Sequence, residues 1–361
     1  MIRFATLLRM SNLEWLLERS RQLAATQQLA PAQAANRAID ELAENSPEPL
    51  SEQELRDQVV TELSGLGVLQ PLLDDQSIEE IWINRPDEVH YFDQFGHHVR
   101  QLSLPHSQIR SLVYRMLKHS GRRIDRVTPY VDAALNDGSR LHVVIPEVTR
   151  DNWAINIRKF RKSLTSLDQL RANRVITTEQ FELLTSAMRS QKSLLIAGAT
   201  QAGKTTLMTA LLNELGDEER LVSCEDTFEL SLNHPDWVAM QTRPASVEGA
   251  QEISLRELVK QALRMRPTRL IIGEVRGAEA LDMLVALNSG IPGLCTLHAN
   301  SAQAAIRKLL TLPLLAGENI TDAFLKPTVL GAFDYAVFCQ RDSDGRRHVA
   351  EILEVTDAVL R

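Results

Sequence analysis

Short apolar runs alternate with amphipathic segments along the second half of the chain. The runs end at glycine or at a charged residue, as buried parallel strands do, and the segments between them repeat apolar residues at helical spacing. The predicted strands cover 192–198, 220–226, 269–274 and 293–299, and the predicted helices cover 177–190, 205–216, 254–265 and 278–290. This alternation predicts a parallel sheet in an α/β domain, with ligands at the carboxyl ends of the strands.

Individual residues mark the ends of two of these helices. Gly216 is expected to end the helix that starts at residue 205, because glycine readily adopts the left-handed conformation that closes many helices. Ser254 and Glu257 form an S-x-x-E capping box before the third helix, and Pro267 is expected to stop it.

Between residues 78 and 160 the pattern changes to alternating apolar and polar positions, which predicts half-buried strands. A Pro-Asp pair and an Asn-Asp-Gly sequence separate neighbouring runs, as turns of β-hairpins do. The predicted strands are 78–84, 89–93, two within 130–146, and 153–160, with amphipathic helices at 51–65 and 107–121. Together they predict an α+β domain, residues 51–160, built on an antiparallel sheet.

Residues 1–50 form an alanine-rich segment that is interrupted by Pro31 and by Ser-Pro-Glu-Pro at 46–49. We expect a small helical packing element here. A helix lying on a membrane surface is the alternative, but acidic residues share the polar face of this segment.

Length and composition narrow the class of protein. A chain of 361 residues with 44% hydrophobic and 24% charged residues can form two ordinary soluble domains. A net charge of −7 argues against a surface made for nucleic acid, and no apolar run approaches the ~18 residues of a transmembrane helix. The N-terminus carries Arg3 and Arg9 in its apolar stretch and shows no clean cleavage site, so we expect no export. Three scattered cysteines exclude a Cys₄ zinc site and suit a reducing cytosol.

Positive charge gathers where the two predicted domains join. Only Asp151 and Asp168 oppose the Lys and Arg residues between positions 150 and 174. A solvated connection and a segment that contacts phosphate both fit this excess. We expect a basic linker at 161–174, followed by the second domain at 175–361. The basic residues are Arg150, Arg158, Lys159, Arg161, Lys162, Arg171 and Arg174.

The turn between the predicted strand 192–198 and the following helix carries a phosphate-binding sequence, GATQAGKTT, which fits G-x-x-x-x-G-K-[ST]. In such a loop the backbone N–H groups point at the phosphates, Lys204 reaches the β and γ phosphates, and the Thr205 hydroxyl binds Mg²⁺. The order of strand, loop and helix places the phosphates at a helix N-terminus. We therefore predict that ATP and Mg²⁺ bind at Gly198, Ala199, Thr200, Gln201, Ala202, Gly203, Lys204, Thr205 and Thr206.

Gln201 and Ala202 stand where related loops often have Gly and Ser. If position 201 needs a positive φ, glutamine costs about 1 kcal/mol there. The motif does not require glycine at this place, so we expect a functional loop.

Charged side chains follow the ends of the predicted strands. Glu225 lies at the end of the strand at 220–226 and Glu229 follows it. Glu274 ends the strand at 269–274, and His298 follows Leu297. Phosphoryl transfer requires a metal, an oriented water and positive charge at the γ phosphate. Placed together beside a phosphate loop, these groups predict a hydrolytic site, although His298 has a structural hydrogen-bonding role as an alternative.

Four stretches, in order, resemble the secretion ATPase superfamily: the phosphate loop, EDTFEL (225–230), LRMRPTRLIIGEVRGAEALDML (263–284) and TLHANS (296–301). That superfamily drives type II and type IV secretion, conjugation and pilus assembly. GLGVLQPLLDD, IEEIWIN, GRRID, YVDAALNDGSRL and NIRKF in the first domain resemble its tight-adherence (Flp) pilus assembly branch (CpaF/TadA). The resemblance extends over about residues 55–355.

The resemblance implies an α/β architecture: a C-terminal RecA-like P-loop ATPase domain, preceded by the α+β domain and the short helical segment. It implies a cytoplasmic homo-hexamer, peripheral at the inner face of the cell membrane, that works on inner-membrane pilus or secretion platform proteins and not on nucleic acid. Glu274 would position or activate the attacking water, and Glu225 and Glu229 would support the metal and that water. The metal-binding residues would be Thr205, Glu225 and Glu274. His298 would sense the γ phosphate, and Arg140 and Arg158 would bring the first domain onto the phosphates.

Three other functions are alternatives to a pilus assembly ATPase. A conjugation or type IV secretion ATPase shares the same motifs. A nucleotide-gated scaffold with little turnover would need the catalytic carboxylates to be lost, and they are present. A DNA-translocating helicase or an ABC protein would need signature motifs that the sequence lacks.

Overall fold

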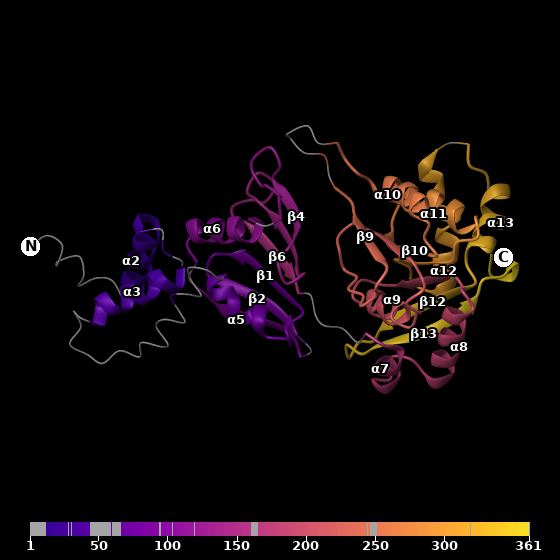
Figure 1. Cartoon of the computed structure of the whole chain (residues 1–361), viewed down its shortest axis with the longest axis horizontal. Helices are drawn as coiled ribbons and strands as arrows, with labels where there is room; N and C mark the ends of the chain where they lie inside the picture. The colour runs from indigo at the N-terminus through magenta and orange to yellow at the C-terminus, as the bar shows by residue number, and fades with distance from the viewer. Residues whose placement is uncertain are drawn as a thin grey trace, which may run out of the picture. The chain divides into compact units, whose positions relative to one another are not determined.

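The computed structural model describes residues 12–27, 29, 31–43, 59, 66–93, 95–102, 104–118, 120–159, 165–243, 245, 251–317 and 319–360. The chain divides into two compact units, Met1–Phe160 and Arg161–Arg361 (Figure 1). The predicted helix at 51–65 and the Ser-Pro-Glu-Pro segment lie outside the described residues, apart from Val59, which is helical.

The first unit begins with two helices, α2 (Asn12–Gln27) and α3 (Pro31–Ala43). Pro31 is the first residue of α3, where proline has no hydrogen bond to lose and its ring fixes a helical φ. The two helices pack through small alanines and a few larger side chains, and Arg19 forms an ion pair with Glu41. The helical character expected for this segment is confirmed in the described part.

A six-stranded sheet forms the rest of the first unit. All of its pairs are antiparallel, in the order β3-β2-β1-β6-β5-β4. Its strands are β1 (Glu80–Arg85), β2 (Glu88–Asp93), β3 (Gly96–Gln101), β4 (Tyr130–Ala134), β5 (Arg140–Val144) and β6 (Ala154–Arg158). The helical elements are η1 (Gly67–Leu69), α5 (Gln70–Asp74) and α6 (His106–Leu117). The antiparallel sheet is confirmed, and β3 was not predicted.

Alternate residues of this sheet enter one hydrophobic core. Ile81 and Ile83 of β1 pack with Ile155 and Ile157 of β6 and with buried residues of α6 such as Val113. The residues between them form the other, polar face of the sheet. The alternating pattern in the sequence therefore reflects an amphipathic sheet with helices on one side.

The second unit contains a seven-stranded sheet in the order β13-β12-β7-β11-β10-β8-β9. The six strands from β12 to β9 pair in parallel, and β13 pairs antiparallel with β12 at the edge. The strands are β7 (Leu194–Gly198), β8 (Leu221–Glu225), β9 (Trp237–Gln241), β10 (Arg269–Val275), β11 (Gly293–Leu297), β12 (Tyr335–Arg341) and β13 (Arg347–Glu354). The parallel sheet is confirmed, whereas β9, β12 and β13 were not predicted.

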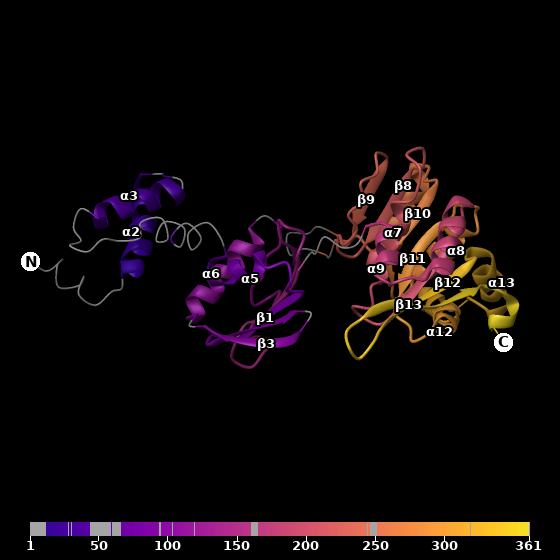
Figure 2. The same cartoon turned by 90° about the horizontal axis from the view of Figure 1, so that it is seen from below.

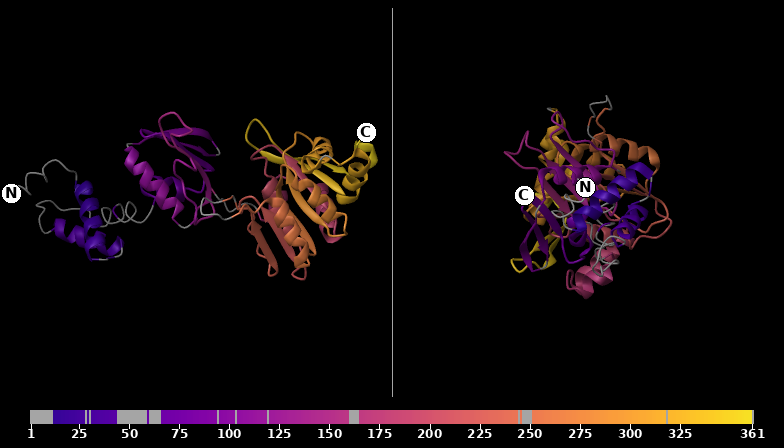
Figure 3. Two further views of the ribbon diagram at one scale, coloured as in Figure 1. Left: turned by 90° about the horizontal axis from the view of Figure 1, so that it is seen from above. Right: turned by 90° about the vertical axis from the view of Figure 1, so that its left-hand side faces the viewer.

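Helices cover both faces of this sheet. On β7, Leu194 and Ile196 face one hydrophobic cluster, and Leu195 and Ala197 face another. The first cluster includes residues of α7 (Leu167–Ala172), α8 (Thr178–Arg189) and α9 (Lys204–Leu212), which lie over the strands in Figure 2. The second includes residues of α10 (Leu255–Ala262), α11 (Glu279–Leu287), α12 (Ala302–Lys308) and α13 (Asp322–Ala332), seen in the left panel of Figure 3. Short 3₁₀ turns complete the unit: η2 (Leu263–Met265), η3 (Leu312–Ala316) and η4 (Asp357–Leu360).

Two sequence predictions need correction. Part of the expected linker is the helix α7, which begins at the Ser166 cap and buries Leu167 and Leu170 completely. Arg171 on its exposed side, and the basic residues that flank the helix in the sequence, concealed an amphipathic helix. The helix after the phosphate loop ends at Leu212, four residues before Gly216, because the chain leaves helical geometry after Asn213. The expected capping of α10 by Ser254 is confirmed, since its hydroxyl accepts a hydrogen bond from the Glu257 N–H.

Candidate functional site

The phosphate-loop sequence forms the turn between β7 and α9. Gly198 ends the strand with φ +155°, and Gly203 precedes the helix with φ +94°. A side chain on Gly198 would collide with the carbonyl oxygen of Cys339 on β12. The loop therefore requires glycine at both positions. α9 begins at Lys204, so the N–H groups of its first turn point into the loop, as in an anion-binding helix terminus.

Lys204 is buried and folds back over the loop. Its Nζ donates to the carbonyl oxygens of Gly198 (3.1 Å) and Ala199 (2.9 Å), and it lies 3.2 Å from His298 Nδ1. The same Nδ1 also lies 3.2 Å from the carbonyl oxygen of Gly198, so the lysine, the loop carbonyl and the imidazole meet at one place. The ammonium group is thus held where the loop encloses an anion.

Glu274 connects this lysine to the neighbouring strand end. Its Oε1 lies 2.6 Å from His298 Nε2, and its Oε2 accepts a hydrogen bond from Arg276 at 2.6 Å. Burial acts to raise the pKa of Glu274, but the hydrogen bond and charge of Arg276, with the charges of His298 and Lys204, lower it overall. Lys204, His298, Glu274 and Arg276 therefore form one continuous chain of polar contacts, with an ionised carboxylate in its middle.

Glu225 ends β8, the strand beside β10, and Glu229 follows it in the next turn. Glu225 is almost completely buried; its Oε2 accepts the N–H groups of Glu229 (2.9 Å) and Leu230 (3.0 Å), and burial raises its pKa. Glu229 in turn accepts the Thr205 hydroxyl at 3.1 Å. The structure thus brings Glu229 directly to the phosphate loop, whereas Glu225 shapes the turn that carries Glu229.

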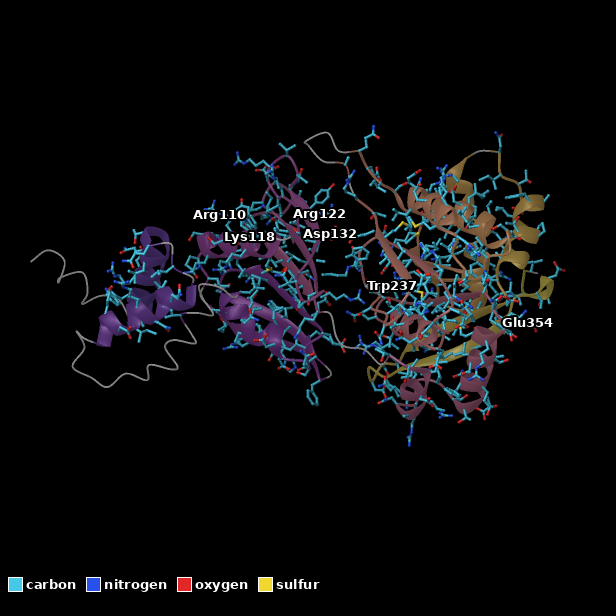
Figure 4. All side chains as sticks on the ribbon, in the orientation of Figure 1. Arg110, Lys118, Arg122, Asp132, Trp237 and Glu354 are labelled. Atoms are coloured by element: carbon cyan, nitrogen blue, oxygen red, sulfur yellow. The ribbon has the colours of Figure 1, made fainter. Side chains whose placement is uncertain are left out.

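Trp237 helps to fix Glu225 from the adjacent strand. Its indole N–H donates to Ser223 Oγ at 3.0 Å, and that hydroxyl contacts Glu225 Oε1 at 3.2 Å. Figure 4 labels Trp237 in the second unit, and Asp132 and the basic Arg110, Lys118 and Arg122 in the first. The buried carboxylate is therefore held from both of its oxygens.

Gln201 adopts the left-handed conformation, with φ +62°. This backbone is strained for glutamine by about 1 kcal/mol, as expected if the position needs a positive φ. Two arginines contact the residue: Arg341 donates to its Oε1 at 2.9 Å, and Arg347 donates to its carbonyl oxygen at 2.8 Å. Both arginines come from the β12–β13 hairpin.

Arg140 and Arg158 belong to the first unit. They occupy directly paired positions on β5 and β6, so their side chains leave the same face of the sheet. The alternation of both strands places this face opposite the hydrophobic core. The structure brings these two arginines together, and their action on the phosphates stays a prediction.

The residues around Thr205 fit a Mg²⁺–nucleotide complex. Among the described residues, no group of three or more His, Cys, Asp and Glu side chains is placed to hold a metal alone. Mg²⁺ in nucleotide sites needs fewer protein ligands, because phosphate oxygens and waters complete its shell. A hydroxyl beside a carboxylate, as in Thr205 and Glu229, is a suitable set of oxygen donors.

Sequence reasoning missed three arginines at this site. Arg276 had a local signal, because it follows Glu274 by two residues. Arg341 and Arg347 lie about 140 residues after Gln201 in the sequence. The parallel pairing of β12 with β7, and the antiparallel pairing of β13 with β12, place them beside it.

The fold and this site define a P-loop nucleotide-binding protein with an added antiparallel domain. Residues 62–329 match the family model described as "Type II/IV secretion system protein". The chain belongs to this family, and the superfamily resemblance is confirmed. No described helix is both long enough and apolar enough to cross a membrane.

Individual relatives agree with this assignment. The chain is 37% identical over 309 residues to a putative conjugal transfer protein of Mycobacterium tuberculosis, covering 83% of this chain and 86% of that protein. It is 30% identical over 329 residues to the type IV secretion system protein VirB11 of Bartonella quintana, covering 80% and 92%. The structure of the Legionella pneumophila ATPase DotB is similar in fold, with a TM-score of 0.54, 18% identity, and coverage of 81% and 80%.

Proposed function

We propose that this protein is an Mg²⁺-dependent ATPase that powers a type IV secretion or conjugation-type system. One observation carries the proposal: the phosphate loop lies inside a network that joins Lys204 through His298 to Glu274, with Glu229 on Thr205. A loop that only bound an anion would not need an ionised carboxylate and an imidazole across from its lysine. The relatives named for conjugal transfer and VirB11 support this system class.

Each side chain has a role in the proposed reaction. Lys204 moves from the loop carbonyls to the phosphate oxygens when ATP binds, which releases His298 to contact the γ phosphate. Glu274, kept ionised by Arg276, orients or activates the attacking water. Thr205 and Glu229 would hold Mg²⁺, which would supply positive charge beside the phosphates. We also propose Glu274 and Glu225 as metal-supporting groups, although Glu225 acts mainly by positioning Glu229.

The tight-adherence pilus branch is the second candidate, supported by the segments of the first unit that resemble it. In either case we propose a homo-hexamer at the cytoplasmic face of the inner membrane, where hydrolysis moves the two domains against membrane platform proteins. Arg140 and Arg158 are proposed to meet the phosphates in that assembly, since paired guanidinium groups suit phosphate oxygens. A nucleotide-gated scaffold would bind ATP without turnover.

Steady-state phosphate release tests the enzyme proposal. We expect turnover with Mg²⁺ and ATP, none with EDTA, and no stimulation by DNA. ATP binding without turnover would favour the scaffold, and strong stimulation by DNA would contradict the absence of a nucleic-acid partner.

Light scattering with and without nucleotide tests the ring. A species of about six chains is expected, and monomers at all concentrations would contradict it. Affinity purification from the native host, followed by identification of the membrane proteins retained, separates the two branches: conjugation or type IV secretion components support the first, and pilin platform components support the second.

A further inference from the structure

Gln201 is the one described residue of the phosphate loop in the left-handed conformation that is not a glycine. The β12–β13 hairpin meets the loop at this residue. Register pairing puts Cys339 of β12 beside Gly198, so β12 runs along the edge of the loop and continues to Arg341. The loop is thus enclosed by a C-terminal hairpin as well as by α9.

The contacts from the hairpin are specific for two different oxygens. Arg341 Nη1 donates to the Gln201 side-chain amide, and Arg347 Nε donates to the Gln201 backbone carbonyl. The stem of Arg347 also crosses the loop, since a methyl group built on Gly203 would lie 3.8 Å from its Cδ. One arginine therefore depends on the identity of residue 201, and the other depends only on the backbone.

The pairing of these arginines supports a functional role. Arg341 and Arg347 stand directly opposite each other on antiparallel strands. Like charges in such a pair repel each other and destabilise a hairpin. The arrangement gains from the two acceptor oxygens of Gln201, and it brings two guanidinium groups to the edge of an anion site.

We propose that Arg341 and Arg347 are positioning residues that hold the phosphate loop in its nucleotide-binding conformation by clamping Gln201. Glutamine at position 201 takes the place of a glycine, which would adopt the left-handed conformation without help but offers no side-chain acceptor. The clamp couples the C-terminal hairpin to nucleotide affinity. The inference rests on the nucleotide binding proposed above.

A double-mutant cycle on full-length protein tests the clamp, with affinity for methylanthraniloyl-ADP as the readout. Arg341→Ala is expected to weaken binding about tenfold, and Arg341→Lys is expected to restore most of it. In a Gln201→Gly background, Arg341→Ala should change affinity by less than about twofold, because the side-chain oxygen through which Arg341 contacts the loop is gone. Arg347→Ala should weaken binding in both backgrounds, because the backbone carbonyl remains.

Arg346→Ala is the matched control: it lies in the same hairpin turn but pairs with Asp342, and its affinity should equal that of the wild type. Equal losses from Arg341→Ala in the wild-type and Gln201→Gly backgrounds would overturn the clamp. Amide hydrogen exchange of residues 199–203 without nucleotide gives a second readout, in which Arg341→Ala should accelerate exchange only when Gln201 is present. If the wild type binds no ADP, the proposed function fails, while the exchange measurement still decides whether the clamp exists.

Discussion

The two sheets of this protein bury their apolar side chains in different ways. The antiparallel sheet of the first unit buries alternate residues, so one side of each strand enters a core and the other side carries polar groups. In the parallel sheet of the second unit, β7, β8 and β11 are buried along their whole length, because helices cover both faces.

This difference decides where each unit can place chemistry. Helices cover both faces of the parallel sheet, so its functional groups lie at strand ends: the loop after β7, Glu225 at the end of β8, and Glu274 one residue before the end of β10. The antiparallel sheet has a polar face, on which Arg140 and Arg158 sit side by side. We therefore expect substitutions at the strand ends of the parallel sheet to abolish ATP hydrolysis, and substitutions on the polar face of the antiparallel sheet to reduce it.

The largest effect is expected at the strand ends. Lys204→Ala and Glu274→Ala should each lower ATP hydrolysis by at least about 10³-fold, because each removes charge placement that the transition state needs. Lys204→Ala should also lose affinity for ATP, whereas Glu274→Ala should still bind it. Glu182→Gln on the exposed side of α8 is the control. Hydrolysis by Glu274→Ala at the wild-type rate would refute the site assignment.

The second effect concerns the stability of the fully covered sheet. Arg269, at the start of β10, is completely buried and pairs with Glu219 at 2.9 Å. Arg269→Ala leaves that carboxylate without its partner and should reduce the free energy of unfolding by about 3–5 kcal/mol. The exposed pair of Arg346 provides the control, since Arg346→Ala should cost only about 0–1 kcal/mol.

Urea unfolding followed by the fluorescence of Trp237 reports on the second unit. Both variants are to be made in a background in which the other tryptophans, Trp15, Trp82 and Trp153, are replaced by phenylalanine, so that Trp237 alone fluoresces. Equal losses for Arg269→Ala and Arg346→Ala would mean that burial of this ion pair has no influence on the stability of the sheet.

The third effect tests the polar face of the first unit. Arg140→Ala or Arg158→Ala should lower kcat at least about tenfold while fold and assembly persist, because a guanidinium group at the phosphates stabilises transition-state charge. Lysine should restore little, since it keeps the charge without the bidentate geometry. Arg126→Ala, which removes an exposed pair with Glu147 in the same unit, should have no effect. Near-normal turnover of a folded double mutant would leave both arginines as surface residues.

The smallest effect is a shift in pH dependence. Arg276 helps to hold the pKa of Glu274 below its ordinary value against the raising effect of burial. Arg276→Ala should raise that pKa, so that the carboxylate becomes protonated at a higher pH. The acid limb of the plot of kcat/KM against pH should therefore shift to higher pH. At pH 8 the rate should fall only a few-fold. Arg189→Ala on α8 is the control, and an unshifted limb would mean that Arg276 does not tune Glu274.

Predictability from sequence depended on how local each signal is and not on which unit carries it. Gly198, Gly203 and Lys204 lie in one short segment, and their roles depend on local geometry that a motif can specify. The helix α7 escaped prediction because its buried Leu167 and Leu170 stand among basic residues. β3, β9 and β13 escaped because they are edge strands, whose structure depends on their pairing partners. β12 lies inside the sheet and was missed as well.

The sequence by itself determined the alternating and continuous hydrophobic patterns, and therefore the two kinds of sheet, together with the phosphate loop and the acidic residues after the strands. Only the tertiary structure decided that Lys204 meets His298, and that Arg341 and Arg347 hold Gln201. The physical reason is the register of the parallel strands. It brings β7, β11 and β12 into contact across about 100 to 140 residues of chain, a distance over which local preferences carry no information.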